Sequence, residues 1–305
     1  MKQPRFSGTG VALVTPFQNG KVDFKALEGI TEHVIRGGVD FLVALGTTGE
    51  AITLSEREAR EVLDCILRVN KGRLPVVAGV FGENSTARLL EKVQGFDFDG
   101  FDAIMSSSPA YNKPNQEGIY RHYMALEKVS PLPIIIYNVP SRTGRNVKAD
   151  TVIRLANSSK KFIAVKEAAG DMEQVMRLAK HRPDHLLVLS GDDPLTLPII
   201  SCGGDGVISV IANALPKEWS EMTHAALQGD WVTARMLHNS MLDIHPWLYI
   251  DGNPSGVKGM MEHLGLCSKE VRLPMAEISE TNLRALIKEV KKLSAFAKAS
   301  ADKKG

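Results

Sequence analysis

The sequence predicts an α/β fold, a (β/α)8 TIM barrel followed by a C-terminal helical appendage. Short apolar runs alternate along the chain with amphipathic segments of helical length. The apolar runs lack the polar alternation of a strand with one wet face, which is typical of parallel strands covered on both sides. The length of 305 residues accommodates one large barrel and an appendage.

Eight apolar runs have the length and composition of buried strands: Gly10–Phe17, Val39–Leu45, Leu74–Val80, Phe101–Ser107, Pro133–Val139, Phe162–Ala168, His185–Ser190 and Gly206–Val210. A helix-like segment follows each run: Phe24–Arg36, Glu56–Val69, Ser85–Phe96, Gln116–Val129, Ala149–Asn157, Met172–Lys180, Pro194–Ser201 and Pro216–Gln228. A strand followed each time by a crossover helix favours parallel pairing.

The strand pattern ends at Gly229-Asp230, and three helix-like segments follow, Trp231–Ile244, Ser255–Leu264 and Thr281–Ala297. We therefore expect a barrel with the active site over residues 1–229, a helical region over 230–297 and a disordered tail over 298–305. The helically spaced apolar residues of Trp231–Ile244 indicate packing within the appendage or an oligomer interface.

The composition favours a cytoplasmic protein that acts on small molecules. Hydrophobic residues make up 44% of the chain and charged residues 24%, which is ordinary for a soluble globular protein without a membrane span. The net charge of +2, without a long basic stripe, argues against nucleic acid as a partner. The three cysteines are widely separated, as in a reducing compartment, and the N-terminus lacks the apolar stretch of a signal peptide.

Lys166 lies within an otherwise apolar strand-like run, Phe162–Ala169. Burial would favour the neutral amine, which attacks carbonyl carbons and can form a Schiff base with a keto acid. The alternative is a lysine that extends its ammonium to water along an apolar surface.

Other distinctive polar residues also fall at the ends of predicted strands, where barrel enzymes carry their active sites. Thr47 and Thr48 follow the second strand, Tyr111 follows the fourth, and Tyr137 and Arg142 end or follow the fifth. Gly191 and Ile208 occupy matching places on the last two strands. We expect all of these residues to converge with Lys166 on one mouth of the barrel.

Each polar group has a chemical interpretation and an ordinary one. The segment Gly46–Gly49 offers hydroxyls and free N–H groups suited to a carboxylate, but it could be a capped turn. Arg142, after a proline, could bind a second carboxylate through two parallel hydrogen bonds, or could lie on a surface turn. Tyr137 could be a core aromatic, and Tyr111 could merely cap a loop.

Together these residues resemble the pyruvate-dependent class I aldolase and lyase superfamily, and within it the dihydrodipicolinate synthase family, from about Gly8 to the C-terminal helices. The resemblance implies that Lys166 forms the Schiff base with pyruvate and that Thr47, Tyr137 and Tyr111 form a hydroxyl relay. It implies that Thr48 binds the pyruvate carboxylate and Arg142 the carboxylate of L-aspartate 4-semialdehyde. Backbone groups of Gly191 and Ile208 would shape the pocket.

The implied product is 4-hydroxy-tetrahydrodipicolinate, the first committed intermediate toward diaminopimelate and lysine. The resemblance further implies that Tyr111 reaches the neighbouring subunit's site, within a tight dimer that doubles to a homotetramer. It implies no cofactor and no metal.

Three alternatives compete with this interpretation. An N-acetylneuraminate lyase would typically carry Gly-Ser-Thr-Gly-Glu where this chain has two threonines, and would lack an arginine at the position of Arg142. A metal-dependent aldolase could use Asp192 and Asp193, but we expect these acids to cap helices or face water. A keto-acid-binding regulator without turnover would need a broken relay, and this relay is complete.

Feedback by lysine is expected to be weak or absent. Of the polar groups that bind lysine in inhibited relatives, Asn84 is present, Arg88 stands where a glutamate is expected and Ala110 replaces a tyrosine. A cationic Arg88 would repel the ammonium group of lysine.

Overall fold

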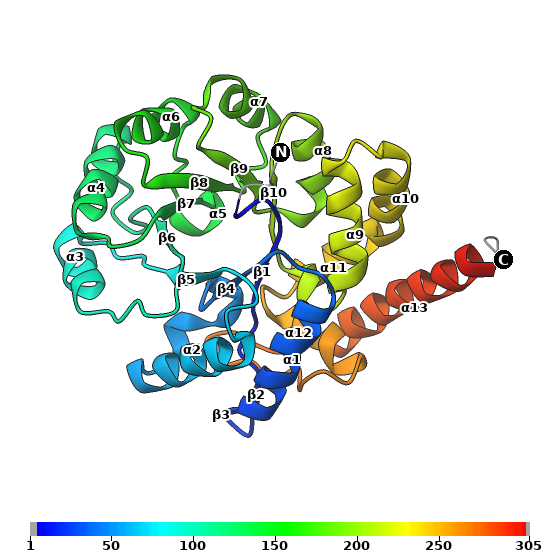
Figure 1. Cartoon of the computed structure of the whole chain (residues 1–305). Coiled ribbons are helices and arrows are strands. Elements are labelled where there is room, and N and C mark those ends of the chain that lie inside the picture. Colours follow the sequence, from blue (N-terminus) through cyan, green and yellow to red (C-terminus); the bar gives the residue numbers. More distant parts are fainter. Residues whose placement is uncertain (1–4, 303–305) are drawn as a thin grey trace.

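The computed structural model of the chain describes residues 5–302. Eight parallel strands close into a barrel in the order β1-β10-β9-β8-β7-β6-β5-β4 (Figure 1). All eight match predicted strands, and the TIM-barrel prediction is confirmed. The strands are β1 (Gly8–Ala12), β4 (Phe41–Ala44), β5 (Val76–Val80), β6 (Ala103–Ser107), β7 (Ile134–Asn138), β8 (Phe162–Glu167), β9 (Leu187–Ser190) and β10 (Gly206–Ser209).

The helices that follow the strands form the outer ring of the barrel (Figure 1). Their bounds lie close to the predicted ones, and α1 and α4 match them because Asp23 and Asn115 cap the first turns with their side chains. The helices are α1 (Phe24–Arg36), α2 (Glu56–Asn70), α3 (Thr86–Gln94), α4 (Gln116–Val129), α6 (Ala149–Ser158), α7 (Met172–His181), α8 (Thr196–Ser201) and α9 (Pro216–Leu227).

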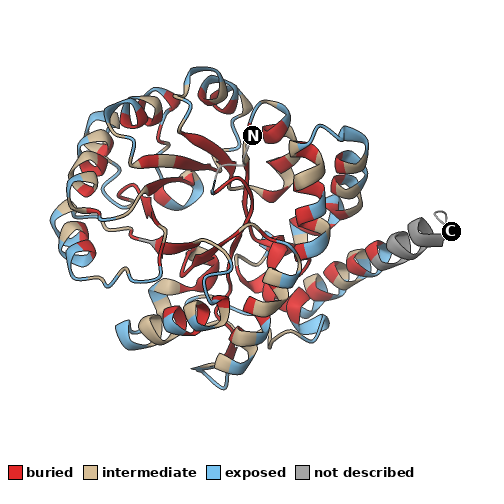
Figure 2. Ribbon diagram, viewed as in Figure 1, coloured by how far each residue is buried: buried red, intermediate tan, exposed pale blue. Residues whose placement is uncertain are grey.

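Alternate residues of each strand pack on opposite faces of the sheet. Ile135, Tyr137 and Ala164 belong to the cluster inside the barrel, whereas their neighbours Ile136 and Val165 belong to the larger cluster under the helices. Figure 2 shows that the barrel strands are mostly buried and that the helices are exposed on their outer faces. Because side chains alternate along a strand, Lys166 points to the same face as Ala164, into the barrel.

The prediction of a strand over Gly10–Phe17 is wrong at its second half. Strand β1 ends at Ala12, and Phe17–Gln18 (β2) pairs instead with Lys21–Val22 (β3) in an antiparallel hairpin. The two residues between them, Asn19 and Gly20, have φ values of 53° and 77°. An Asn-Gly pair at positive φ is the preferred sequence of a tight hairpin turn, so the signal was present in the sequence.

The C-terminal region consists of α10 (Trp231–Met241), a 3-10 turn Leu242–Ile244, α11 (His245–Tyr249), α12 (Ser255–His263) and α13 (Glu280–Asp302). Helix α11 was not predicted. Helix α13 extends away from the barrel (Figure 1) and continues into the segment predicted to be a tail, while residues 303–305 lie outside the described part. None of the helices within 5–302 is long and apolar enough to cross a membrane.

Candidate active site

A cavity of about 210 Å³ opens at the C-terminal ends of the strands. Its walls include Asn253 and Tyr249 from the C-terminal region as well as residues of the barrel loops. Six of the eight residues predicted to form the site line it: Thr47, Thr48, Tyr137, Arg142, Lys166 and Gly191. The structure therefore brings together groups that are spread over most of the chain.

Lys166 is buried, with 7% of its surface exposed, so it does not extend its ammonium to water. Burial lowers the pKa of Lys166 to about 8, and the positive charge of Arg142 acts in the same direction, while the negative charge of Asp193 opposes both. With a pKa of about 8, roughly a tenth of Lys166 is the neutral amine at pH 7, and this is the form that attacks carbonyl groups.

Gly191 leaves room for the stem of this lysine. A Cβ atom at this position would lie 2.8 Å from Cγ and 2.9 Å from Cε of Lys166. The Gly191 N–H donates to the carbonyl of Glu167 at 2.7 Å, which continues the pairing of β8 and β9 past the strand ends. Any larger residue at position 191 would displace Lys166.

Thr47 and Tyr137 form a pair of hydroxyls beside the lysine. Thr47 Oγ1 and the Tyr137 hydroxyl share a hydrogen bond of 3.1 Å. The Tyr137 ring centroid lies 5.4 Å from Lys166 Nζ. Burial raises the pKa of Tyr137 while the bond to Thr47 opposes the shift, so the phenol stays protonated and can pass a proton along the pair.

Thr48 is held from outside the barrel. It is 2% exposed, and its hydroxyl oxygen accepts a hydrogen bond of 3.1 Å from Asn253 Nδ2. Because the oxygen is already the acceptor for Asn253, the hydroxyl proton of Thr48 is available for an acceptor in the cavity. A carboxylate is such an acceptor.

Arg142 lies on one helical turn, α5 (Pro140–Thr143), where a loop was expected. Pro140 occupies the first helical position and Gly144 ends the turn at a φ of 68°. Arg142 is exposed and lines the cavity, so its guanidinium is at the mouth, where an anionic substrate would enter.

Asp192 and Asp193 were expected to cap helices or to face water, and Asp193 does not face water. Asp193 is 1% exposed, and its Oδ2 accepts hydrogen bonds from the N–H groups of Val210 and Ile211 at 3.0 and 2.9 Å. The Tyr249 hydroxyl donates to the same oxygen at 3.3 Å. Two backbone N–H groups and one hydroxyl thus contact Oδ2 of this buried acid in place of water.

Two predicted site residues do not line the cavity. Ile208 is 1% exposed within the barrel interior, and Val210, two residues later, lines the wall instead. Tyr111 is 88% exposed and lies outside the cavity of its own chain. Its loop is nevertheless fixed, since the N–H groups of Ala110 and Tyr111 donate to Asn84 Oδ1 at 2.9 and 3.2 Å.

A buried polar network lies behind Tyr137 and Lys166. Those two residues are partners in the β7–β8 register, and the next pair in that register is Asn138 and Glu167. Glu167 Oε2 accepts from Asn138 Nδ2 at 2.8 Å and from Gln174 Nε2 at 2.9 Å. Burial raises the pKa of Glu167, and these donors oppose the shift. The network fixes the strand ends that carry Tyr137 and Lys166.

Comparison with known proteins identifies the family to which the chain belongs. The profile of the Dihydrodipicolinate synthetase family matches residues 5–293. A 4-hydroxy-tetrahydrodipicolinate synthase of Flavobacterium psychrophilum is 48% identical over 276 residues, which cover 90% of this chain and 94% of that protein.

Solved structures agree with the sequence comparison. A 4-hydroxy-tetrahydrodipicolinate synthase from Methylacidiphilum fumariolicum superimposes with a TM-score of 0.92 at 37% identity, over 97% of this chain and 99% of that one. A monomeric dihydrodipicolinate synthase variant gives a TM-score of 0.92 at 34% identity, over 95% and 97%. The family match and these relatives cover almost the whole chain, and the protein belongs to the dihydrodipicolinate synthase family.

Proposed function

We propose that the protein is a lyase that condenses pyruvate with L-aspartate 4-semialdehyde to give 4-hydroxy-tetrahydrodipicolinate, on the pathway to diaminopimelate and lysine. The observation that carries this proposal is the buried Lys166, with its lowered pKa, beside the Thr47–Tyr137 hydroxyl pair in one cavity. Membership of the family and the names of its relatives support the same reaction.

The reaction begins with the neutral amine of Lys166. Its nitrogen attacks the keto carbon of pyruvate, water leaves, and the resulting iminium withdraws electrons from the neighbouring methyl group. Loss of a methyl proton gives an enamine, whose carbon attacks the aldehyde carbon of the semialdehyde and regenerates the iminium. The amino group of the semialdehyde then attacks the iminium carbon, which closes the ring and releases the amine of Lys166. Tyr137 and Thr47 carry the protons that these steps require, with their hydroxyls 3.1 Å apart.

Two carboxylates are bound at different depths. Thr48, buried and oriented by Asn253, binds the pyruvate carboxylate with help from the backbone N–H groups of its turn. Arg142, at the mouth, binds the carboxylate of the semialdehyde. Gly191 leaves room for the lysine, and the backbone at Ile208 shapes the wall from behind.

Tyr111 completes the relay in the cavity of a second subunit. Its exposed ring, on a loop fixed by Asn84, supports an assembly in which it enters the neighbouring site of a dimer, with two dimers forming a tetramer. The enzyme acts in the cytoplasm. We assign the catalytic barrel to residues 1–229, of which 1–4 lie outside the described part, and the appendage to residues 230–297. The appendage contributes Tyr249 and Asn253 to the cavity.

The Lys166→Ala variant is expected to fold and to lose nearly all turnover, because no covalent intermediate can form. Incubation of the wild type with pyruvate and borohydride, followed by digestion and mass spectrometry, should place the reduced adduct on Lys166. Lys258, which is also buried but paired with Glu50, is the internal control and should carry none. Unchanged activity of Lys166→Ala would exclude the mechanism.

The acceptor is identified with the same enzyme preparation. Turnover with L-aspartate 4-semialdehyde is expected. Turnover with N-acetylmannosamine is not expected, since this polyol has no carboxylate for Arg142 to bind. Pyruvate adduct formation without turnover of either acceptor would instead support a keto-acid-binding regulator.

The rate of adduct formation at saturating pyruvate should rise with pH and reach half its maximum near the Lys166 pKa of about 8, because only the neutral amine reacts. Asp193→Asn removes a charge that favours the ammonium form and should lower this midpoint, whereas Arg142→Gln should raise it. Midpoints that move in the same direction would contradict the assignment of both charges.

Mixing two inactive variants tests the position of Tyr111. Tyr111→Phe and Lys166→Ala, reassembled together, should recover activity, since one mixed site then contains Lys166 from one chain and Tyr111 from the other. Thr47→Val mixed with Lys166→Ala is the matched control, because both residues line the cavity of the same chain. Mixed dimers without recovered activity would show that Tyr111 does not act between subunits.

Submillimolar lysine is expected to leave the initial rate unchanged. Arg88 is exposed on α3, and its positive charge repels the ammonium group of lysine. Asn84 Oδ1 already accepts hydrogen bonds from the Tyr111 loop and is not free to bind lysine. Titration calorimetry with lysine checks the prediction, and Arg88→Glu, which removes the repulsion, should bind lysine more tightly than the wild type. Clear inhibition of the wild type would overturn the prediction.

A further inference from the structure

The turn that carries Thr47 and Thr48 has an unfavourable backbone at both ends. Leu45 and Glu50 have φ values of 58° and 51°, in the left-handed region that residues with a Cβ atom avoid. Each such residue costs about 1 kcal/mol or more, and the conformation persists only where surrounding contacts impose it. The contacts of this turn therefore determine where its two hydroxyls lie.

Glu50 supplies the most enclosed of these contacts. Its side chain is 2% exposed, and Oε1 accepts a hydrogen bond of 2.5 Å from Lys258 Nζ. Oε2 accepts a second bond of 2.9 Å from the backbone N–H of Arg272. Both oxygens are thus bound by residues of the C-terminal region, which are more than 200 positions after Glu50 in the chain.

The side chain of Lys258, on α12, has no exposed surface. Its Nζ also donates to the carbonyl of Glu270 at 2.8 Å, and it lies 4.2 Å from the ring centroid of Phe17. Burial lowers the pKa of Lys258, and the charge and hydrogen bond of Glu50 oppose this shift. The charged amine depends on Glu50 as its counter-ion.

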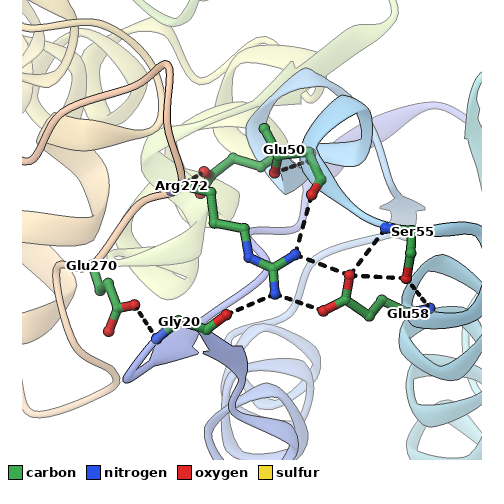
Figure 3. Close-up of polar contacts among 7 residues, drawn as sticks. Gly20, Glu50, Ser55, Glu58, Glu270 and Arg272 are labelled. Carbon is green, nitrogen blue, oxygen red and sulfur yellow. Dashed lines mark hydrogen bonds and ion pairs between the residues drawn. The ribbon is translucent and has the colours of Figure 1, made fainter.

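Arg272, in the C-terminal region, also binds residues in the N-terminal half of the chain. Figure 3 shows its side chain between Glu58 and Gly20. The guanidinium donates to both oxygens of Glu58, at 3.0 and 2.6 Å, and to the carbonyl of Gly20 at 2.9 Å. The backbone N–H that binds Glu50 is therefore itself fixed by the surrounding ion pair.

The segment leading into α12 makes a second contact with the turn. Asn253, before the helix, donates to Thr48, and Lys258, within it, donates to Glu50. The two contacts lie on either side of Gly49, whose carbonyl accepts from Thr15 at 2.7 Å. The position of the turn relative to Lys166 is consequently set by α12 as well as by the barrel.

We propose that Glu50 and Lys258 are positioning residues for the keto-acid carboxylate: their buried ion pair fixes the turn so that Thr48 meets the carboxylate while Lys166 meets the keto carbon. The inference rests on the proposed function of Thr48. It assigns to α12 a part in the first chemical step, although no residue of that helix lines the cavity within the described chain.

Stability alone is a poor explanation for a charged pair at this depth. Removing two charges from water costs several kcal/mol each, and well-packed apolar residues of similar volume are often equally stable. An ion pair differs from apolar packing in that it fixes a distance and a direction. Those two quantities are what a carboxylate cradle requires.

Glu50→Asp is the decisive variant, because it keeps the charge but withdraws the carboxylate by one methylene. The pyruvate concentration for half-maximal borohydride trapping on Lys166 should rise by about tenfold or more, the loss expected when a hydrogen bond to a charged group is weakened. The KM for the semialdehyde and the pH midpoint of trapping should stay as in the wild type. Lys258→Met should also raise the half-maximal pyruvate concentration, and it replaces Glu50→Asp as the test if that variant does not fold.

Asp205→Asn is the matched control. Its partner Arg182 forms an ion pair that is also largely buried, with side chains 20% and 19% exposed, but Asp205 precedes β10 at the opposite end of the barrel. This variant should lower the melting temperature and leave pyruvate trapping unchanged.

The outcomes separate the inference from the proposed function. A folded Glu50→Asp with unchanged pyruvate dependence, where Thr48→Val raises it, would overturn the positioning role alone. Unchanged pyruvate dependence in Thr48→Val would instead remove the carboxylate assignment on which the inference rests. Glu50→Asp and Lys258→Met could instead behave like Asp205→Asn, with a lowered melting temperature and unchanged pyruvate trapping. The pair would then serve stability only.

Discussion

Lys166 lies inside a closed barrel of parallel strands, where its ammonium form loses the water that stabilises it elsewhere. Burial lowers its pKa to about 8 and makes the neutral amine accessible near physiological pH. Several other features of the site accommodate this one side chain. Gly191 leaves space for its stem, Glu167 and Asn138 fix the strand ends behind it, and the Tyr137–Thr47 pair lies beside its nitrogen.

The same cavity must hold an uncharged amine first and a cation afterwards. The iminium intermediate is a cation, so a site that only destabilised positive charge would also oppose the intermediate. Asp193 resolves this conflict, because its buried carboxylate favours positive charge on Lys166 without being a solvent-exposed anion. Its Oδ2 accepts hydrogen bonds from the N–H groups of Val210 and Ile211 in place of water.

The sequence was sufficient to predict the barrel and six of the eight candidate residues that line the cavity. Strands covered on both faces are recognisable as apolar runs, and the residues with catalytic chemistry stand at their ends, which a barrel brings to one mouth. Asn253 and Tyr249 were not predicted, because no local pattern connects a residue beyond the last strand to a loop 200 positions earlier. Asp193 was expected to cap a helix or to face water, and its burial was not predicted, since burial of an acid depends on donors that only the folded chain supplies. The Asn19-Gly20 turn, by contrast, had a local signal that was overlooked.

The contribution of the C-terminal region follows from how barrels are built. Loops at the ends of strands leave the sheet that fixes the strands, so a loop with unfavourable backbone angles needs support from elsewhere. The Thr47–Thr48 turn receives that support from Asn253, Lys258 and Arg272, all beyond the last strand. A region that looks like an appendage in the order of the chain therefore determines the geometry of the first loop of the active site. Mutations in α12 should consequently affect keto-acid binding before they affect the barrel, whose strands and outer helices do not depend on that helix for their pairing.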